Sequence, residues 1–116
     1  MSDKLVVFVS CEGKEQAERI AAALVEERLA ACVNVLPGIS SCYVWEGKLR
    51  WSQEAMLVIK STREAFGALE KRVLELHTYE VPEILGVPVE LGSQKYLQWV
   101  GDSVQKKYTS SVGPRT

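Results

Sequence analysis

The stretch LVVFV, Leu5 to Val9, decides the fold, because a continuous apolar run rich in valine predicts a strand that is buried on both faces. A second run of the same kind, AMLVIK, spans Ala55 to Lys60 and is again apolar without alternation. Two such strands in one short chain indicate a sheet whose centre is covered from both sides. The segments around these runs must supply the rest of the sheet and its cover.

Between the two runs the sequence predicts one helix and a long hairpin. The helix carries a core-facing stripe of apolar residues at helical spacing, made of Ala17, Ile20, Ala21, Leu24 and Val25. An extended segment then runs from Cys32 to Leu36, bends at Pro37-Gly38 and continues from Ile39 to Trp45. Glu46-Gly47 predicts a hairpin turn, and the return strand spans Leu49 to Lys60.

After the second apolar run the sequence predicts a helix, a strand and a final short helix. Ser61 and Glu64 have the spacing of a capping box, which starts a helix that runs to about His77. A fourth strand follows from Ile84 to Leu91, and Pro88 within it favours an edge position or a bulge. The last helix runs from Tyr96 to about Val104, and the polar segment 108–116 is expected to be a flexible tail.

The order βαββαβ plus a terminal helix predicts an α+β fold, a ferredoxin-like sandwich with both main helices on one face of an antiparallel sheet. We expect residues 1–107 to form this single domain. Helices cover only one face, whereas the strands at Leu5–Val9 and Ala55–Lys60 are apolar on both. The second face is therefore expected to be buried against copies of the same chain.

The composition is that of an ordinary globular chain of one domain's length. It has 116 residues, a formal net charge of −1 from 14 basic and 15 acidic residues, and 47% hydrophobic residues. This balance gives no general attraction to nucleic acid or to anionic membranes. No apolar run approaches the ~20 residues that cross a bilayer, and the first residues lack the pattern of a secretory signal. We expect a cytoplasmic protein without membrane insertion and without a nucleic-acid partner.

Four classes of function share this element order, so the site residues must distinguish them. Copper chaperones place two thiols in the first strand–helix loop, where this chain has Cys11 and Lys14. Its three cysteines, Cys11, Cys32 and Cys42, lack that spacing and indicate reduced thiols.

RNA-recognition motifs need several exposed aromatic residues, and the third strand offers Trp51 alone. Acylphosphatases need a glycine-rich anion loop, which is absent. The fourth class is a trimeric sensor or metal-responsive protein with its site in the clefts between subunits, and no enzymatic activity is expected.

Four segments carry a resemblance to a known family: VEERLAACVNVLPGISSCYVWEGKL, MLVIKST, HTYEVPEILGVPVELG and YLQWV. They are collinear over roughly residues 4–104, and in them the chain resembles the CutA1 family, which is named for divalent-cation tolerance. The resemblance implies a ferredoxin-like protomer in a homotrimer similar to PII signalling proteins. It also implies a response to, or weak binding of, divalent ions such as Cu(II), with no cofactor required. The alternative is a PII-like trimer that senses a small ligand or docks on a partner through its inter-subunit clefts.

The resemblance implies one candidate metal ligand, His77, which is the only histidine of the chain. In some family members a cysteine at the end of the first strand and two adjacent histidines near the end of the second helix bind copper. These positions correspond to Val9, Leu76 and His77, so His77 alone is retained, and Thr78 replaces a proline that usually follows it. Three roles stay open for His77 from the residues themselves: packing or capping at the helix end, weak metal contact, and catalysis.

Further residues match the family's cleft between subunits, which the resemblance implies is a binding surface. They are Tyr43, Trp45, Lys60, Tyr79, Pro82, Glu83 and Trp99. A lysine at a strand end can pair with an anion, and Tyr79 and Glu83 can hydrogen-bond to a ligand. The same residues could instead serve only to join the subunits, with the tryptophans as packing anchors.

Overall fold

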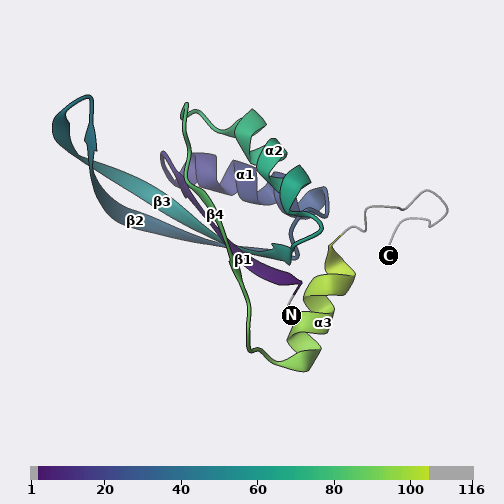
Figure 1. Cartoon of the computed structure of the whole chain (residues 1–116). Coiled ribbons are helices and arrows are strands. Elements are labelled where there is room, and N and C mark those ends of the chain that lie inside the picture. The colour runs from purple at the N-terminus through teal and green to yellow at the C-terminus, as the bar shows by residue number, and fades with distance from the viewer. Residues whose placement is uncertain (1–2, 105–116) are drawn as a thin grey trace.

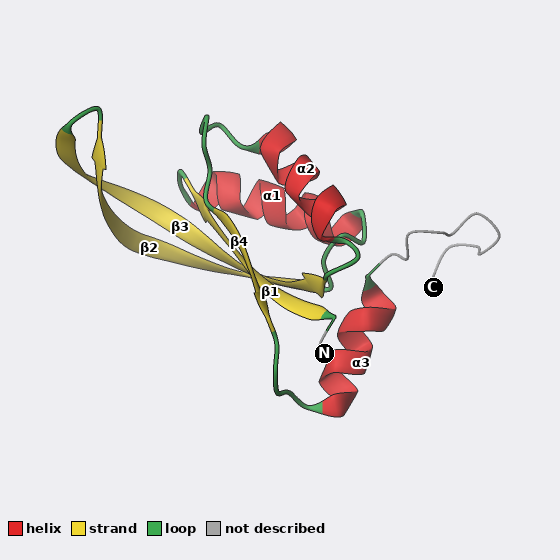
Figure 2. Cartoon of the chain, in the orientation of Figure 1, coloured by secondary structure: helices red, strands yellow, loops and turns green. Residues whose placement is uncertain are grey.

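The computed structural model describes residues 3–104, and within them strands and helices follow in the order β-α-β-β-α-β-α (Figures 1 and 2). The elements are β1 (Lys4–Cys11), α1 (Lys14–Glu26), β2 (Cys32–Trp45), β3 (Lys48–Thr62), α2 (Phe66–Leu76), β4 (Ile84–Pro88) and α3 (Gln94–Ser103). The predicted α+β class and element order are confirmed. The predicted tail, 108–116, lies outside the described residues.

The four strands form one antiparallel sheet in the order β2-β3-β1-β4. The run Leu5–Val9 lies at its centre, where Val7 is opposite Ile59 on one side and Gly86 on the other. β4 is an edge strand, as Pro88 predicted, and it ends at that proline instead of continuing to Leu91. Proline has no N–H to donate to the sheet, so pairing beyond it is reduced to a bond from Val89 N–H to the Lys4 carbonyl.

One face of the sheet is covered by α1 and α2, which lie together on the same side (Figure 2). The core between these layers is built from alternate residues of the central strands and the inner stripes of both helices. Its fully buried members include Val7, Val9, Leu57, Ile59, Ile20, Leu24, Leu69 and Val73. Burial of this apolar surface is the main stabilising contribution to the fold.

The opposite face of the sheet is only partly covered within the single chain. Val6 and Phe8 are half-buried there, and Leu85 and Val87 on β4 are exposed. α3 lies on this side near the start of β1, where Val100 and the following Val104 are buried (Figure 1). The strand run at Leu5–Val9 is thus fully buried on one side only, and burial of its other side requires a second surface.

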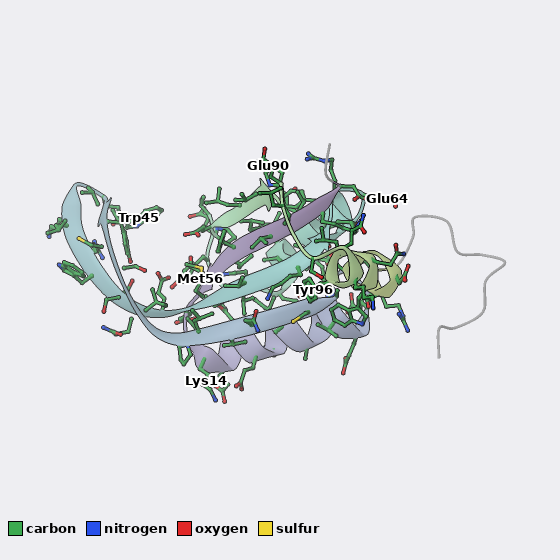
Figure 3. All side chains as sticks on the ribbon, turned by 90° about the horizontal axis from the view of Figure 1, so that it is seen from below. Lys14, Trp45, Met56, Glu64, Glu90 and Tyr96 are labelled. Carbon is green, nitrogen blue, oxygen red and sulfur yellow. The ribbon has the colours of Figure 1, made fainter. Side chains whose placement is uncertain are left out.

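The hairpin of β2 and β3 extends beyond the sheet as a long arm, and the chain measures 51 × 29 × 21 Å. Figure 3 places Trp45 in this arm, well away from the helices. The pairing register shifts between Leu36 and Ile39, which confirms the predicted irregularity at Pro37-Gly38. At the tip, Glu46 and Gly47 both have positive φ, as a tight hairpin turn requires.

The predicted capping box at Ser61 and Glu64 is wrong. β3 continues through Thr62, so Ser61 is still a strand residue on the core side, and its hydroxyl donates to the Leu29 carbonyl at 2.7 Å. The hydroxyl of Thr62 instead accepts from Ala65 N–H at 3.1 Å. Ser61 therefore belongs to β3, although its spacing from Glu64 predicted a helix cap.

Candidate functional site

His77 lies directly after α2, where its main-chain N–H donates to the Val73 carbonyl and closes the helix. Its ring is nearly buried and uses both nitrogens. Nε2 lies 2.7 Å from the Ser10 carbonyl oxygen, and Nδ1 lies 3.1 Å from Tyr79 N. A carbonyl only accepts and an amide N–H only donates, so this geometry selects the neutral ring with its proton on Nε2. The imidazole thereby ties β1 to the segment after α2.

This arrangement favours the packing and capping role that the sequence left open for His77. In the neutral ring the lone pair that a metal ion could use is on Nδ1, and it accepts the Tyr79 N–H bond. Metal binding by His77 would require that bond to break. Val9 and Leu76, the positions that the resemblance assigns to two further ligands, are buried and half-buried apolar residues. The assignment of His77 as a metal ligand stays a prediction.

Thr78 continues the polar connection toward the start of α1. Its hydroxyl accepts from Gln16 Nε2 at 2.8 Å and donates to a Glu12 carboxylate oxygen at 3.0 Å. Gln16 in turn accepts from Glu12 N–H at 2.9 Å through its side-chain oxygen. The Thr78 hydroxyl thus hydrogen-bonds to a residue of α1 and to the loop before it. These bonds hold the start of the segment 77–83 against the body of the protein.

The segment 77–83 and the hairpin arm enclose a hollow of about 610 Å³. This volume is within the usual range for small-molecule sites. Its lining combines aromatic, acidic and small polar side chains from β1, β2, β3 and the segment before β4. The lining residues are Ser10, Ser41, Cys42, Tyr43, Trp45, Arg50, Glu54, Tyr79, Glu80, Val81 and Glu83. Four of the predicted cleft residues, Tyr43, Trp45, Tyr79 and Glu83, are therefore brought together.

A hydrogen bond between Tyr79 and Glu54 lies in this hollow. The phenol of Tyr79 donates to Glu54 Oε2 at 2.7 Å, and Glu54 is only 8% exposed. Burial, followed by the bond to Glu54 and the charge of that carboxylate, raises the pKa of Tyr79 far above its usual value. Tyr79 is therefore a neutral hydrogen-bond donor at physiological pH, and it is not available as a base.

The charge of Glu54 also acts on a buried thiol nearby. Burial, with a smaller contribution from Glu54, raises the pKa of Cys11 to about 11. Cys11 is therefore a neutral thiol near pH 7, whereas Cys42 on the arm is exposed. Cys32 has an intermediate exposure, and all three cysteines are free thiols, as predicted from their spacing. Within residues 3–104, no group of three or more His, Cys, Asp or Glu side chains is arranged to hold a metal ion.

The other predicted cleft residues lie elsewhere or only border the hollow. Lys60 is on the partly covered sheet face, opposite Val6 and Cys32, and donates to Asn34 Oδ1. Trp99 is on α3, where its ring lies 5.7 Å from that of Tyr96. Pro82 is half-buried between two residues that line the hollow. Within one chain, Lys60 and Trp99 do not join the hollow.

Sequence reasoning missed Glu54, which is the buried acid of the hollow. Its signal was present, because a carboxylate directly before the apolar run AMLVIK is unusual in a strand that enters a core. It also missed Ser10, Ser41, Arg50 and Val81 as lining residues, whereas Cys42 and Glu80 were considered only as groups that could assist a metal at His77. Their proximity depends on how the arm and the segment 77–83 border the same hollow, which no local pattern displays.

Comparison with known proteins identifies the family. The sequence profile described as "CutA1 divalent ion tolerance protein" matches residues 5–103. The chain belongs to the CutA1 family. The divalent-cation tolerance protein CutA of Thermus thermophilus is 47% identical over 98 residues, which cover 84% of this chain and 95% of that protein. A human CutA1-family protein, named Protein CutA, is 46% identical over 93 residues, 80% of this chain and 52% of its own length.

Solved CutA1 structures have the same fold. The Thermus thermophilus protein superposes with a TM-score of 0.86 at 45% identity, covering 88% of this chain and 99% of that one. CutA1 from Oryza sativa has a TM-score of 0.88 at 40% identity, covering 90% and 96%. The rice relative is named chloroplastic, and an Archaeoglobus fulgidus relative of known structure is named periplasmic. Within residues 3–104 no helix of this chain is long and apolar enough to span a membrane.

Proposed function

We propose that this chain is a divalent-cation tolerance protein that works as a homotrimer and binds metal ions such as Cu(II) weakly. The observation that supports this function best is the family match over residues 5–103, together with a close relative that is named for divalent-cation tolerance. The names of these relatives describe tolerance and no reaction, and we propose no enzymatic activity and no required cofactor. We further propose a cytoplasmic location and a single domain over residues 1–107.

The homotrimer is supported by apolar surface that one chain leaves uncovered. Leu85 and Val87 on β4 are exposed beside the half-buried Phe8. On the arm, Leu49 and Trp51 are each 68% exposed. Exposed apolar side chains in this number are typical of a protein interface. Closing three such sheets around a common axis, as in PII proteins, would bury the second face and let each arm lie along a neighbour.

Light scattering tests the assembly. We expect a species of three times the chain mass of 12.9 kDa at all concentrations at which the protein remains folded. Replacing Phe8 by Glu should disrupt assembly and folding together, since it places a charge on the proposed interface. A folded monomer of the wild-type chain at low concentration would contradict the proposal.

Weak Cu(II) binding is the expected metal property, with His77 as the ligand that the family resemblance names. The test is calorimetric titration of chelator-treated protein with Cu(II). We expect binding that His77→Ala weakens and that Glu70→Ala, on the exposed side of α2, leaves unchanged. Equal binding in the wild type and in His77→Ala would remove His77 from the metal site, and absent binding in the wild type would remove direct metal contact.

The second candidate function is a PII-like trimer that recognises a small ligand or partner through its clefts. It is supported by the hollow of about 610 Å³, in which Tyr43, Trp45, Tyr79 and Glu83 meet. In a trimer, Lys60 and Trp99 could reach a cleft from a neighbouring subunit, with Pro82 at its border. A thermal-shift screen of anions, nucleotides and cations tests this function. No shift by any compound, together with unchanged partner capture by Lys60→Ala, would contradict it.

A further inference from the structure

The chain leaves α1 through a residue in the left-handed conformation, and that residue is an arginine. Arg28 has a φ of 60°, which glycine adopts without strain and most other residues avoid. The turn closes as helix ends with a glycine usually do. Arg28 N–H donates to the Val25 carbonyl at 3.1 Å, and Leu29 N–H donates to the Leu24 carbonyl at 2.9 Å. A strained backbone of this kind persists where other contacts offset its cost, so the side chain of Arg28 is expected to make a stabilising contact.

The side chain of Arg28 reaches the C-terminal end of α3. Its Nη1 lies 3.5 Å from the Ser103 carbonyl oxygen, in a partly buried contact between residues 75 positions apart. The last carbonyls of a helix have no partner within the helix and carry partial negative charge, which a nearby cation stabilises. α3 has no basic residue in its own last turn, and Asp102 adds a negative charge there. Arg28 therefore supplies, from the end of α1, a positive charge that the last turn of α3 does not itself contain.

α3 is attached to the rest of the chain outside the main core. Val100 and Val104 are buried, but neither belongs to the core cluster that the sheet forms with α1 and α2. The segment that leads into α3, residues 89–93, contains no helix or strand. An element with few buried apolar contacts opens at a lower free energy than the core does. A single contact at the end of α3 therefore has a large share in how firmly this helix is held.

We infer that Arg28 is a positioning residue that fastens the C-terminal end of α3 to the end of α1, and that this contact offsets the strain of its left-handed backbone. α3 carries Tyr96 and Trp99, whose rings lie 5.7 Å apart. Arg28 thereby holds this aromatic pair in place for the cleft between subunits, a consequence that rests on the proposed trimer. The fastening itself lies within one chain and involves neither His77 nor the hollow beside the arm.

Hydrogen exchange of the full chain, followed by mass spectrometry of its peptides, tests this inference. Arg28→Gly relieves the backbone strain and removes the contact to Ser103, so the variant should stay folded while the amides of α3 exchange about three- to tenfold faster. The amides of α1 should exchange no faster than in the wild type, because glycine suits the turn that ends this helix. Arg28→Lys keeps a positive charge at the same position and should restore part of the protection of α3.

Glu46→Gly is the matched control, because Glu46 also has a positive φ, 54°, and lies at the tip of the arm, far from α3 within the chain (Figure 1). Glycine relieves the same kind of strain there, and the exchange of α3 should not change. Unchanged exchange of α3 in Arg28→Gly would overturn the inference. Equal acceleration in α1 and α3, or the same acceleration of α3 in Glu46→Gly, would also overturn it. Light scattering of the wild type tests the trimer separately, so the two proposals can fail independently.

Discussion

Replacing His77 by alanine should destabilise the protein even when no metal is present. The ring bonds to the Ser10 carbonyl at 2.7 Å and to Tyr79 N–H at 3.1 Å, and its centre lies 4.8 Å from that of the Tyr79 ring. Each main-chain group left unpaired costs ~1–3 kcal/mol, and the ring contact adds ~0.5–1.5 kcal/mol. Water entering the vacated space offsets part of this, so we expect a loss of about 2–4 kcal/mol in the free energy of unfolding.

Denaturant unfolding followed by circular dichroism measures this loss, at one protein concentration and with a chelator present. Two further variants divide the effect between the two bonds. The amide nitrogen of His77→Gln can occupy the position of Nε2 and donate to Ser10, and the side-chain oxygen of His77→Asn can occupy that of Nδ1 and accept from Tyr79. Each should therefore lose less stability than His77→Ala.

Glu70→Ala is the control for the same experiment, because Glu70 is exposed on α2 and should change the free energy of unfolding by less than about 0.5 kcal/mol. The reasoning fails if His77→Ala unfolds at the wild-type denaturant concentration in the presence of chelator. Such a result, combined with lost Cu(II) binding, would show that His77 is kept for metal contact and that its two hydrogen bonds contribute nothing.

Three other predictions concern the core, the pH dependence and the thiols. Leu57→Ala, at a fully buried position in β3, should lower the free energy of unfolding by ~2–5 kcal/mol, as denaturant unfolding would measure. Leu74→Ala, half-exposed on α2, should lower it by less than about 1 kcal/mol. Equal losses in the two variants would contradict the assigned core. Burial raises the pKa of Cys11 from 9.0 to about 11, so its stabilising contribution is complete below pH 9 and is lost progressively as the pH rises to 11. A Cys11→Ala variant should show a flatter decline over that range, and an identical pH profile would refute this assignment. Iodoacetamide at neutral pH should modify Cys42 first and Cys11 only on unfolding, as peptide mass mapping would show; early labelling of Cys11 would contradict its burial.

The element order could be predicted from the sequence because each element has a local signal. Continuous apolar residues marked β1 and the second half of β3, and Pro88 marked an edge strand that the structure confirms. The failure at Ser61 has a local cause as well. A capping-box spacing says nothing about where the preceding strand ends, and the Leu29 carbonyl that accepts from Ser61 is 32 residues away in sequence.

The candidate site was only partly predictable, because its residues come from segments far apart in the sequence. Tyr79 was identified, yet its partner Glu54 lies 25 residues earlier on a different element. His77 drew attention as the only histidine, whereas its role depends on the Ser10 carbonyl, 67 residues away. Spacing rules predict contacts within one element. The contacts of this site join different elements, and they form only when the sheet brings distant segments together.

By itself, the sequence determined the α+β class, the strand that forms the sheet centre and the excess of apolar surface that one chain cannot bury. These follow from periodicity and composition, which are properties of consecutive residues. Only the tertiary structure decided that both nitrogens of His77 bond to the main chain and that the Tyr79 phenol donates to the buried Glu54. The physical reason is that burial and hydrogen-bond pairing depend on which segments are neighbours in space, and only the complete fold determines this.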